Sequence, residues 1–239
     1  MKKKILMIGN TDGLPGVPLD IDTYYNFFTS PIGGNWCHEE IDILLDTDRR
    51  CLFRKINEIE RTRYDYLITF YSGHGNEASD GTSLHINEYE TIAMRELLGL
   101  SPRHLLILHC CRNYALVPDD IRPGPSMLSM RRDPVRKAYE DQIWYSAPQE
   151  VILFACDEGE LAWGTCAGGY YLQHLLFVAK MALADYLFVS VSHAHRKAVS
   201  LMKTDPHLRQ HPQIRQTPCL PKRRLPLAVN SSYWTDYDH

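Results

Sequence analysis

The chain has 239 residues, of which 44% are hydrophobic and 23% are charged. This composition is typical of a globular protein with enough apolar residues for one sizeable core or two small ones. With 26 Lys and Arg against 29 Asp and Glu, the formal net charge of −3 argues against nucleic acid or an anionic membrane as the main partner. Local basic patches remain compatible with that charge.

The seven cysteines form an odd set without a C-x-x-C pair, which favours neither a disulfide framework nor a zinc ribbon. We therefore expect a reducing, cytoplasmic location and no metal site. The apolar run at residues 5–8 is too short for a signal peptide. The most apolar long stretch, residues 175–191, contains Lys180 and Asp185, so no membrane span is expected. No glycine-rich phosphate-binding motif occurs.

Five short apolar runs predict strands that are buried on both faces, as in a parallel sheet between two helical layers. Apolar residues at helical spacing predict helices after Thr47 and in three later segments, and a sixth strand is expected at residues 186–191. Alternating strands and helices predict an α/β sandwich with a mainly parallel sheet. The five runs are residues 5–8, 41–45, 66–71, 105–108 and 151–155, and the three later helices are residues 91–100, 171–184 and 192–202.

Residues 113–149 interrupt this pattern with five prolines and two basic pairs. A connection of this length inside a compact domain is usually functional or disordered, so it is predicted to be a long regulatory or processed loop. Residues 226–239 lack periodicity and are predicted to be an exposed tail. One domain is therefore expected over residues 1–225.

Reactive side chains follow the third and fourth apolar runs. His74 lies between Gly73 and Gly75, and Cys111 comes shortly after residues 105–108. The carboxyl ends of parallel strands meet at one edge of a sheet, where sites usually lie. A thiol becomes a good nucleophile beside a base, and glycine N–H groups can bind an oxyanion. Each residue alone has an ordinary alternative, a buried structural cysteine or a surface histidine, but their combination predicts a His–Cys site.

Residues 70–75, Phe-Tyr-Ser-Gly-His-Gly, resemble the histidine motif of the caspase-like cysteine peptidases, above all of metacaspases and their bacterial relatives. Residues 106–111, Leu-Ile-Leu-His-Cys-Cys, are similar to the nucleophile strand of the same family. Weaker similarities at residues 4–10, 14–20, 153–162, 168–172 and 211–213 extend the resemblance over most of the chain. It implies a caspase-like three-layer sandwich with a mainly parallel six-stranded sheet flanked by helices.

The resemblance also implies the chemistry. His74 and Cys111 would form the catalytic dyad, with Cys110 as the less favoured nucleophile. The backbone N–H groups of Gly75 and Cys111 would bind the oxyanion. No metal or cofactor is required by this reaction, and calcium is a candidate activator because it activates many metacaspases.

Substrate specificity follows from the positions that line the family's pocket. Asp20 matches a metacaspase pocket acid and Ser72 a pocket serine, whereas His109 stands where metacaspases have an acid and caspases have Gln. A buried carboxylate favours a cationic partner, so cleavage after Arg or Lys is expected. The alternative for Asp20 is a helix N-cap before residues 24–28.

The long loop and the family resemblance also predict self-cleavage and a biological role. If basic residues are preferred, the long loop offers candidate self-cleavage sites, unless it is an ordinary solvated loop; they are Arg122, Arg131, Arg132 and Arg136. The resemblance implies a protein substrate, such as a pore-forming protein, an activator protein, and a role in regulated cell death or antiviral defence. The alternatives are a non-catalytic caspase-like binding module and another peptidase branch with a different preference.

Overall fold

The computed structural model describes residues 1–78, 81–112, 133–165, 168–205 and 208–235. Six strands of this part form the central sheet in the order β12-β8-β7-β3-β1-β2. All neighbouring pairs are parallel except β12 and β8, which are antiparallel. The strands are β1 (Lys3–Gly9), β2 (Ile41–Leu45), β3 (Tyr66–Ser72), β7 (Arg103–His109), β8 (Gln149–Phe154) and β12 (Gln213–Gln216).

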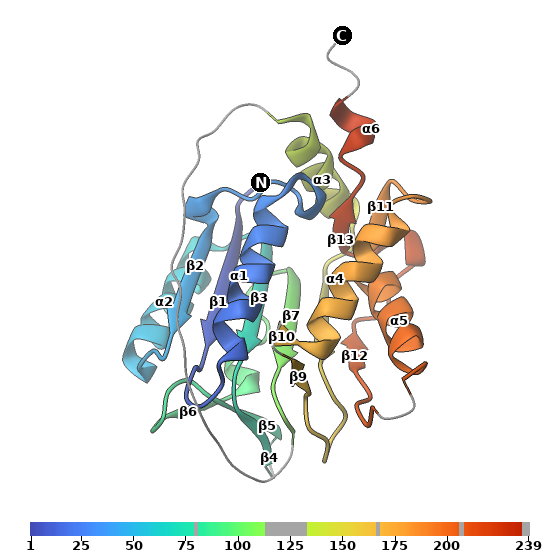
Figure 1. Ribbon diagram of the computed structural model, residues 1–239. Helices are drawn as coiled ribbons and strands as arrows, with labels where there is room; N and C mark the ends of the chain where they lie inside the picture. The colour runs from blue at the N-terminus through green and yellow to red at the C-terminus, as the bar shows by residue number, and fades with distance from the viewer. Residues whose placement is uncertain (79–80, 113–132, 166–167, 206–207, 236–239) are drawn as a thin grey trace.

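Helices cover both faces of this sheet, which confirms the three-layer α/β sandwich (Figure 1). They are α1 (Gly16–Thr29), α2 (Arg49–Thr62), α3 (Pro134–Tyr145), α4 (Tyr170–Ala182), α5 (Val191–Met202) and the short α6 (Ser232–Thr235). Three small antiparallel sheets complete the described elements: β4 (Gly75–Ala78) with β5 (Gly81–His85) and β6 (Thr91–Ala93), β9 (Gly164–Thr165) with β10 (Gly168–Gly169), and β11 (Phe188–Ser190) with β13 (Pro226–Val229). No helix among the described residues is long and apolar enough to cross a bilayer.

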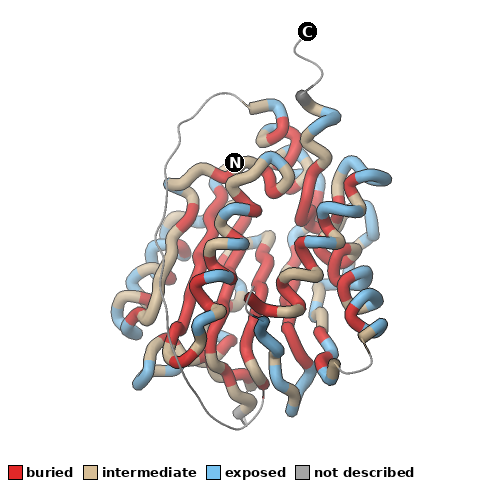
Figure 2. Tube along the Cα trace, in the orientation of Figure 1, coloured by how far each residue is buried: buried red, intermediate tan, exposed pale blue. Residues whose placement is uncertain are grey.

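The core has two parts because successive strand residues point to opposite faces of the sheet. Ile5 and Met7 of β1 pack with α1, α3, α4 and α5, whereas Leu6 and Ile8 pack with α2. The central strands are buried along their whole length, while the helices expose one side (Figure 2). Continuous apolar runs were therefore the correct signal for these strands.

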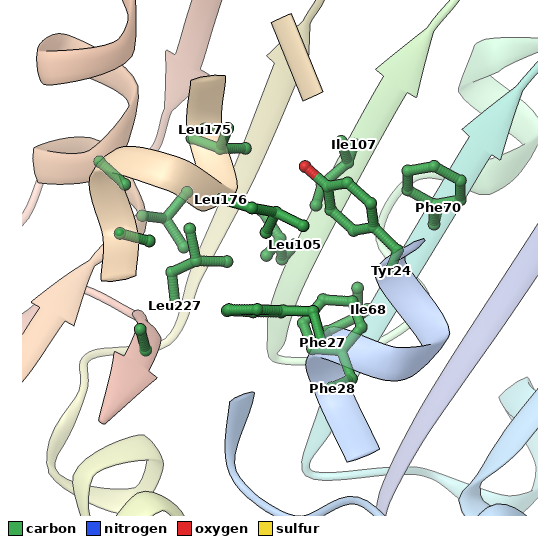
Figure 3. Packing of buried hydrophobic residues seen from close by; sticks show 14 of the residues in the cluster. Tyr24, Phe27, Phe28, Ile68, Phe70, Leu105, Ile107, Leu175, Leu176 and Leu227 are labelled. Carbon is green, nitrogen blue, oxygen red and sulfur yellow. The ribbon is translucent and has the colours of Figure 1, made fainter. Parts of the chain in front are cut away.

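Aromatic residues of α1 pack into the larger of the two parts of the core, on the face of the sheet that α1, α3, α4 and α5 cover (Figure 3). The Tyr24 ring stacks on Phe70 of β3 with centroids 4.5 Å apart. Leu227 of β13 lies in the same cluster and is fully buried. The prediction of an exposed tail over residues 226–239 is therefore wrong for Pro226–Val229, which form a buried strand.

Two further predictions are corrected at the periphery. Residues 186–191 do not supply the sixth strand of the central sheet, because Phe188–Ser190 pair with β13 instead. The sixth strand is the polar edge strand Gln213–Gln216, which has no apolar run. Residues 91–100 are not an α-helix but contain β6 followed by a short 3-10 helix at Met94–Leu97.

The predicted loop over residues 113–149 also contains a helix, α3. Asp133 caps it by accepting from the Val135 N–H at 2.9 Å, and Pro134 occupies the first helical turn, where its missing N–H costs nothing. The described end of the segment is therefore helical. Residues 113–132 lie outside the described residues.

Candidate active site

The candidate site lies where β1, β3 and β7 end together. Ser72, the last residue of β3, pairs with Gly9 of β1 on one side and with His109 of β7 on the other. The two predicted reactive residues follow these strand ends, so the parallel register brings their segments to one edge of the sheet.

Gly75 allows these segments to approach each other. A Cβ placed on Gly75 would lie 2.8 Å from Cys110 Sγ and 3.0 Å from the Cys111 carbonyl oxygen, closer than side chains tolerate. The chain after His74 therefore packs directly against the chain around Cys111. Among the described residues, the Cys111 backbone N–H has no acceptor, which leaves it available for a ligand oxygen.

The His74 imidazole is half-buried and fixed by a backbone carbonyl. Its Nε2 lies 2.6 Å from the Asp12 carbonyl oxygen. Because a carbonyl only accepts hydrogen bonds, this contact assigns the proton to Nε2 and leaves the Nδ1 lone pair free as a base. The sequence gives no signal for Asp12, since its backbone rather than its side chain acts here.

The backbone of His74 is held as firmly as its ring. The buried Tyr71 hydroxyl lies within hydrogen-bonding distance of the carbonyl oxygens of His74 and His85 and donates its one proton to either of them. The His85 N–H donates to the His74 carbonyl at 3.0 Å. The His85 ring lies 6.0 Å from the His74 ring, and burial, then the neighbouring His74, lower the pKa of His85. His85 is a site neighbour that the sequence did not reveal.

The two adjacent thiols differ in accessibility. Cys110 is buried, and burial raises its pKa well above the ordinary value. Cys111 is partly exposed, and its Sγ lies 3.9 Å from the Ala162 carbonyl oxygen; burial raises its pKa as well. Cys156 is also buried, with its pKa raised to about 12 by burial and then by the neighbouring Cys111. Cys111 is therefore the accessible thiol of the three.

Arg112 anchors the chain immediately after Cys111. Its guanidinium is buried and contacts Glu77 of β4 at 3.1 Å and Glu158 at 2.9 Å. Its backbone N–H donates to the Glu160 carbonyl at 2.9 Å. These contacts join the segment after β7 to β4 and to the loop after β8. The sequence analysis did not predict the two carboxylate partners of Arg112.

Asp20, Ser72 and His109 lie together beside this centre, as the resemblance implied. Asp20 is buried within α1, where one carboxylate oxygen accepts from Ser72 Oγ at 2.7 Å and the other from the Gly169 N–H at 2.6 Å. Asp20 is the fifth residue of α1, so the N-cap alternative is wrong. Gly169 is a further member of the cluster that the sequence did not identify.

His109 contributes a buried, neutral imidazole to the same cluster. Burial lowers its pKa, although the neighbouring Asp20 opposes the shift. Its Nδ1 is buried without a hydrogen-bond partner. A Cβ on Gly169 would lie only 2.5 Å from His109 Nε2, so glycine is needed for this packing. The cluster therefore combines one carboxylate with one uncharged ring.

The candidate self-cleavage residues divide into two groups. Arg122, Arg131 and Arg132 lie outside the described residues. Arg136 lies in α3 and forms two hydrogen bonds to Glu40, at 2.6 and 2.8 Å, which raise its pKa. A peptide bond within a helix and beside an anchored side chain is a poor peptidase substrate, so the assignment of Arg136 as a self-cleavage site is corrected.

The fold and the paired strand ends define a caspase-like α/β protein. The family model of the peptidase C14 caspase domain matches residues 2–225, so the chain belongs to this family. The crystal structure of caspase-1 from Spodoptera frugiperda is similar with a TM-score of 0.57 and 12% sequence identity, over 90% of this chain and 86% of that one. At that identity the likeness shows the fold alone. No curated protein matches the chain. Membership of this family supports a cysteine peptidase that acts on proteins.

Proposed function

We propose that the protein is a cysteine endopeptidase in which Cys111 is the nucleophile and His74 its general base and acid. The observation that carries this proposal is the close packing of the Gly75 segment against the Cys110–Cys111 backbone at the shared strand ends. The accessible thiol and the imidazole with a free Nδ1 stand on these two segments. The thiol and the imidazole therefore belong to segments that meet at one edge of the sheet.

In the first half of the reaction, His74 Nδ1 takes the thiol proton as Cys111 Sγ attacks the peptide carbonyl carbon. Because burial raises the pKa of Cys111, the thiol depends on this base rather than ionising alone. The N–H groups of Gly75 and Cys111 stabilise the oxyanion. The protonated imidazole then gives its proton to the departing amine, which leaves a thioester on Cys111.

In the second half, His74 takes a proton from water, the resulting hydroxide attacks the thioester, and the thiolate leaves and is reprotonated. The Asp12 carbonyl keeps the imidazole in one tautomer and orientation throughout. The same contact stabilises the protonated ring, because a carbonyl oxygen is a better partner for a cation than for a neutral donor.

For substrate specificity, we propose that Asp20 binds an Arg or Lys side chain before the scissile bond, with Ser72 and His109 beside it. A carboxylate has about four lone-pair sites. Ser72 and Gly169 use two of them, so Asp20 retains capacity for a cationic partner. Because His109 is neutral, the pocket holds one negative charge where two acids would hold two.

A fluorogenic peptide panel with Arg, Lys, Asp, Leu and Gln before the scissile bond tests this function. We expect hydrolysis of the Arg and Lys peptides, loss of at least about 10³-fold in Cys111→Ala and His74→Ala, and retention in the control Cys110→Ala. Activity that survives in Cys111→Ala would refute the nucleophile. Preference for Asp, Leu or Gln would refute the role of Asp20 but leave the dyad intact.

The same peptide panel is run with added calcium and with a chelator. Among the described residues, no group of three or more His, Cys, Asp and Glu side chains is arranged to hold a metal ion. No step of the mechanism involves calcium. Faster hydrolysis with calcium than with a chelator would support calcium activation, and equal rates would exclude it.

We further propose a cytoplasmic role in regulated cell death or antiviral defence, with a pore-forming protein as substrate, an activator protein as trigger, and self-cleavage after Arg122, Arg131 or Arg132. Family resemblance supports these proposals. Mapping of new protein termini in cells that express wild type or Cys111→Ala tests them, because only the active enzyme should generate termini after Arg or Lys in the substrate and in this segment.

A further inference from the structure

A cavity of about 240 Å³ lies away from the candidate active site. Its wall includes the start of α5 and the 3-10 turn Pro221–Arg223 with Arg224. The turn follows β12, whose last residue, Gln216, pairs with Val151 near the start of β8. The cavity therefore lies toward the amino end of β8, at the edge of the sheet opposite to Cys111.

The cavity wall carries positive charge without compensation. Arg196, Lys222 and Arg224 line it, and no Asp or Glu does. Among the described residues none of these three side chains forms an ion pair, whereas the buried Arg112 contacts two carboxylates. Three cations around one cavity without an acidic residue favour an anionic ligand over a neutral or cationic one.

The start of α5 adds to the positive potential. Ser190 caps this helix by accepting from the His193 N–H, and the first turn presents the positive end of the helix dipole. Burial lowers the pKa of His193, and the neighbouring Arg196 and Lys197 lower it further. The cavity thus combines side-chain cations with a helix amino end.

The backbone that carries the cations is fixed before any ligand binds. The Arg223 carbonyl accepts from the Ala147 N–H at 2.9 Å and from Gln149 Nε2 at 2.8 Å, and the Arg224 carbonyl accepts from Ser146 Oγ at 2.9 Å. Preorganisation of this kind reduces the entropy lost on binding.

We propose that this basic pocket, formed by Ser190, His193, Arg196, Lys222 and Arg224, binds a compact phosphorylated small molecule. Its volume lies below the roughly 300–1,000 Å³ of sites for drug-sized ligands, which favours a phosphate, a pyrophosphate or a mononucleotide over a large cofactor. The half-exposed Tyr186 ring is tilted by 59° to the His193 ring, with centroids 5.0 Å apart, and is the aromatic ring of the wall on which a base could stack. Side chains rather than a glycine-rich loop would hold the phosphate.

Isothermal titration calorimetry on the full chain with inorganic phosphate, pyrophosphate and AMP tests this site without using peptidase activity. We expect one site for pyrophosphate, and affinity reduced about tenfold or more in each of Arg196→Gln, Lys222→Gln and Arg224→Gln. The matched controls Arg50→Gln and Lys203→Gln, which remove exposed cations elsewhere, should bind as wild type. Arg196 is exposed, so its variant tests the site even if Arg224→Gln fails to fold.

The arms also separate the sources of phosphate. Tighter binding of AMP than of phosphate, with this difference lost in Tyr186→Ala, would identify a nucleotide as the ligand. Equal affinities for AMP and phosphate in the wild type would show that the phosphate group alone is recognised. Absence of binding at millimolar probe concentration, or equal loss in the pocket variants and the controls, would overturn the proposal. Binding of an RNA oligonucleotide or an acidic peptide without any of the three small probes would overturn it as well.

Discussion

Charged side chains are paired differently at the two edges of the central sheet that are formed by the carboxyl and the amino ends of its strands. At the proposed catalytic edge Arg112 is paired with Glu77 and Glu158, whereas Asp20 accepts hydrogen bonds from the neutral Ser72 hydroxyl and Gly169 N–H. At the opposite edge no Asp or Glu lines the basic pocket, and among the described residues its three cations form no ion pair. Internal pairing therefore neutralises Arg112, and the partner proposed for Asp20 is a basic substrate side chain. Unpaired charge at the second edge indicates that its partner comes from outside the chain.

The largest expected effect tests the pairing at the catalytic edge. Arg112→Ala leaves the partly buried Glu77 without its cation, and such a break costs about 3 kcal/mol. We expect urea denaturation to show this loss, and peptidase activity to fall with it because the segment after Cys111 is released.

The control for this variant is Lys137→Ala, which removes an exposed i, i+4 pair with Asp141. Exposed pairs contribute about 0–1 kcal/mol, so stability should be almost unchanged. Equal losses in the two variants would contradict the distinction between a buried structural pair and a solvated one.

Acidic pH tests the prediction that the core keeps His195 uncharged. His195 of α5 is buried beside the Tyr171 hydroxyl, and burial, then Arg196, lower its pKa to about 4. Because the unfolded value is about 6.5, the folded protein binds fewer protons, so its stability is full above pH 6.5 and falls by about 3 kcal/mol toward pH 4. Unfolding free energies measured across this range should show the decline.

His195→Gln should flatten that part of the profile, since glutamine does not titrate. An unchanged slope in the variant would assign the acid sensitivity to other groups, of which the buried His109 at the catalytic edge is the first candidate.

The smallest effect concerns the close packing of Gly169 against His109 in the proposed substrate site. Gly169→Ala places a methyl group 2.5 Å from the His109 ring, and overpacking of this kind costs about 1–3 kcal/mol. We expect KM for Arg peptides to rise in Gly169→Ala even under conditions where the variant remains fully folded. Gly164→Ala is the matched control because nothing lies within 4 Å of its added Cβ. Identical kinetics in both variants would show that His109 does not adjoin the substrate.

The sequence predicted the central strands well for a physical reason. Strands buried on both faces need continuous apolar runs, and residues 5–8 and 105–108 have them. The edge strand Gln213–Gln216 is polar and partly exposed, so no such run marks it. Pro226–Val229 are apolar, but without periodicity they could not be distinguished from a tail.

Candidate site residues could be proposed from the sequence where side chains carry the signal. His74, Cys111, Asp20, Ser72 and His109 were identified from the sequence, and the structure brings the last three into contact or close proximity. The Asp12 carbonyl and the Gly169 N–H were missed because backbone groups are the same at every residue. Their roles depend on tertiary placement alone.

One labelling experiment tests the central claim most directly. The protein is treated with a peptidyl chloromethyl ketone that carries Arg, and the modified residue is identified by peptide mass spectrometry in wild type, His74→Ala and Cys110→Ala. The account predicts a single adduct on Cys111 in wild type and in Cys110→Ala, and strongly slowed labelling in His74→Ala. An adduct on Cys110 or Cys156, or undiminished labelling of Cys111 without His74, would contradict it.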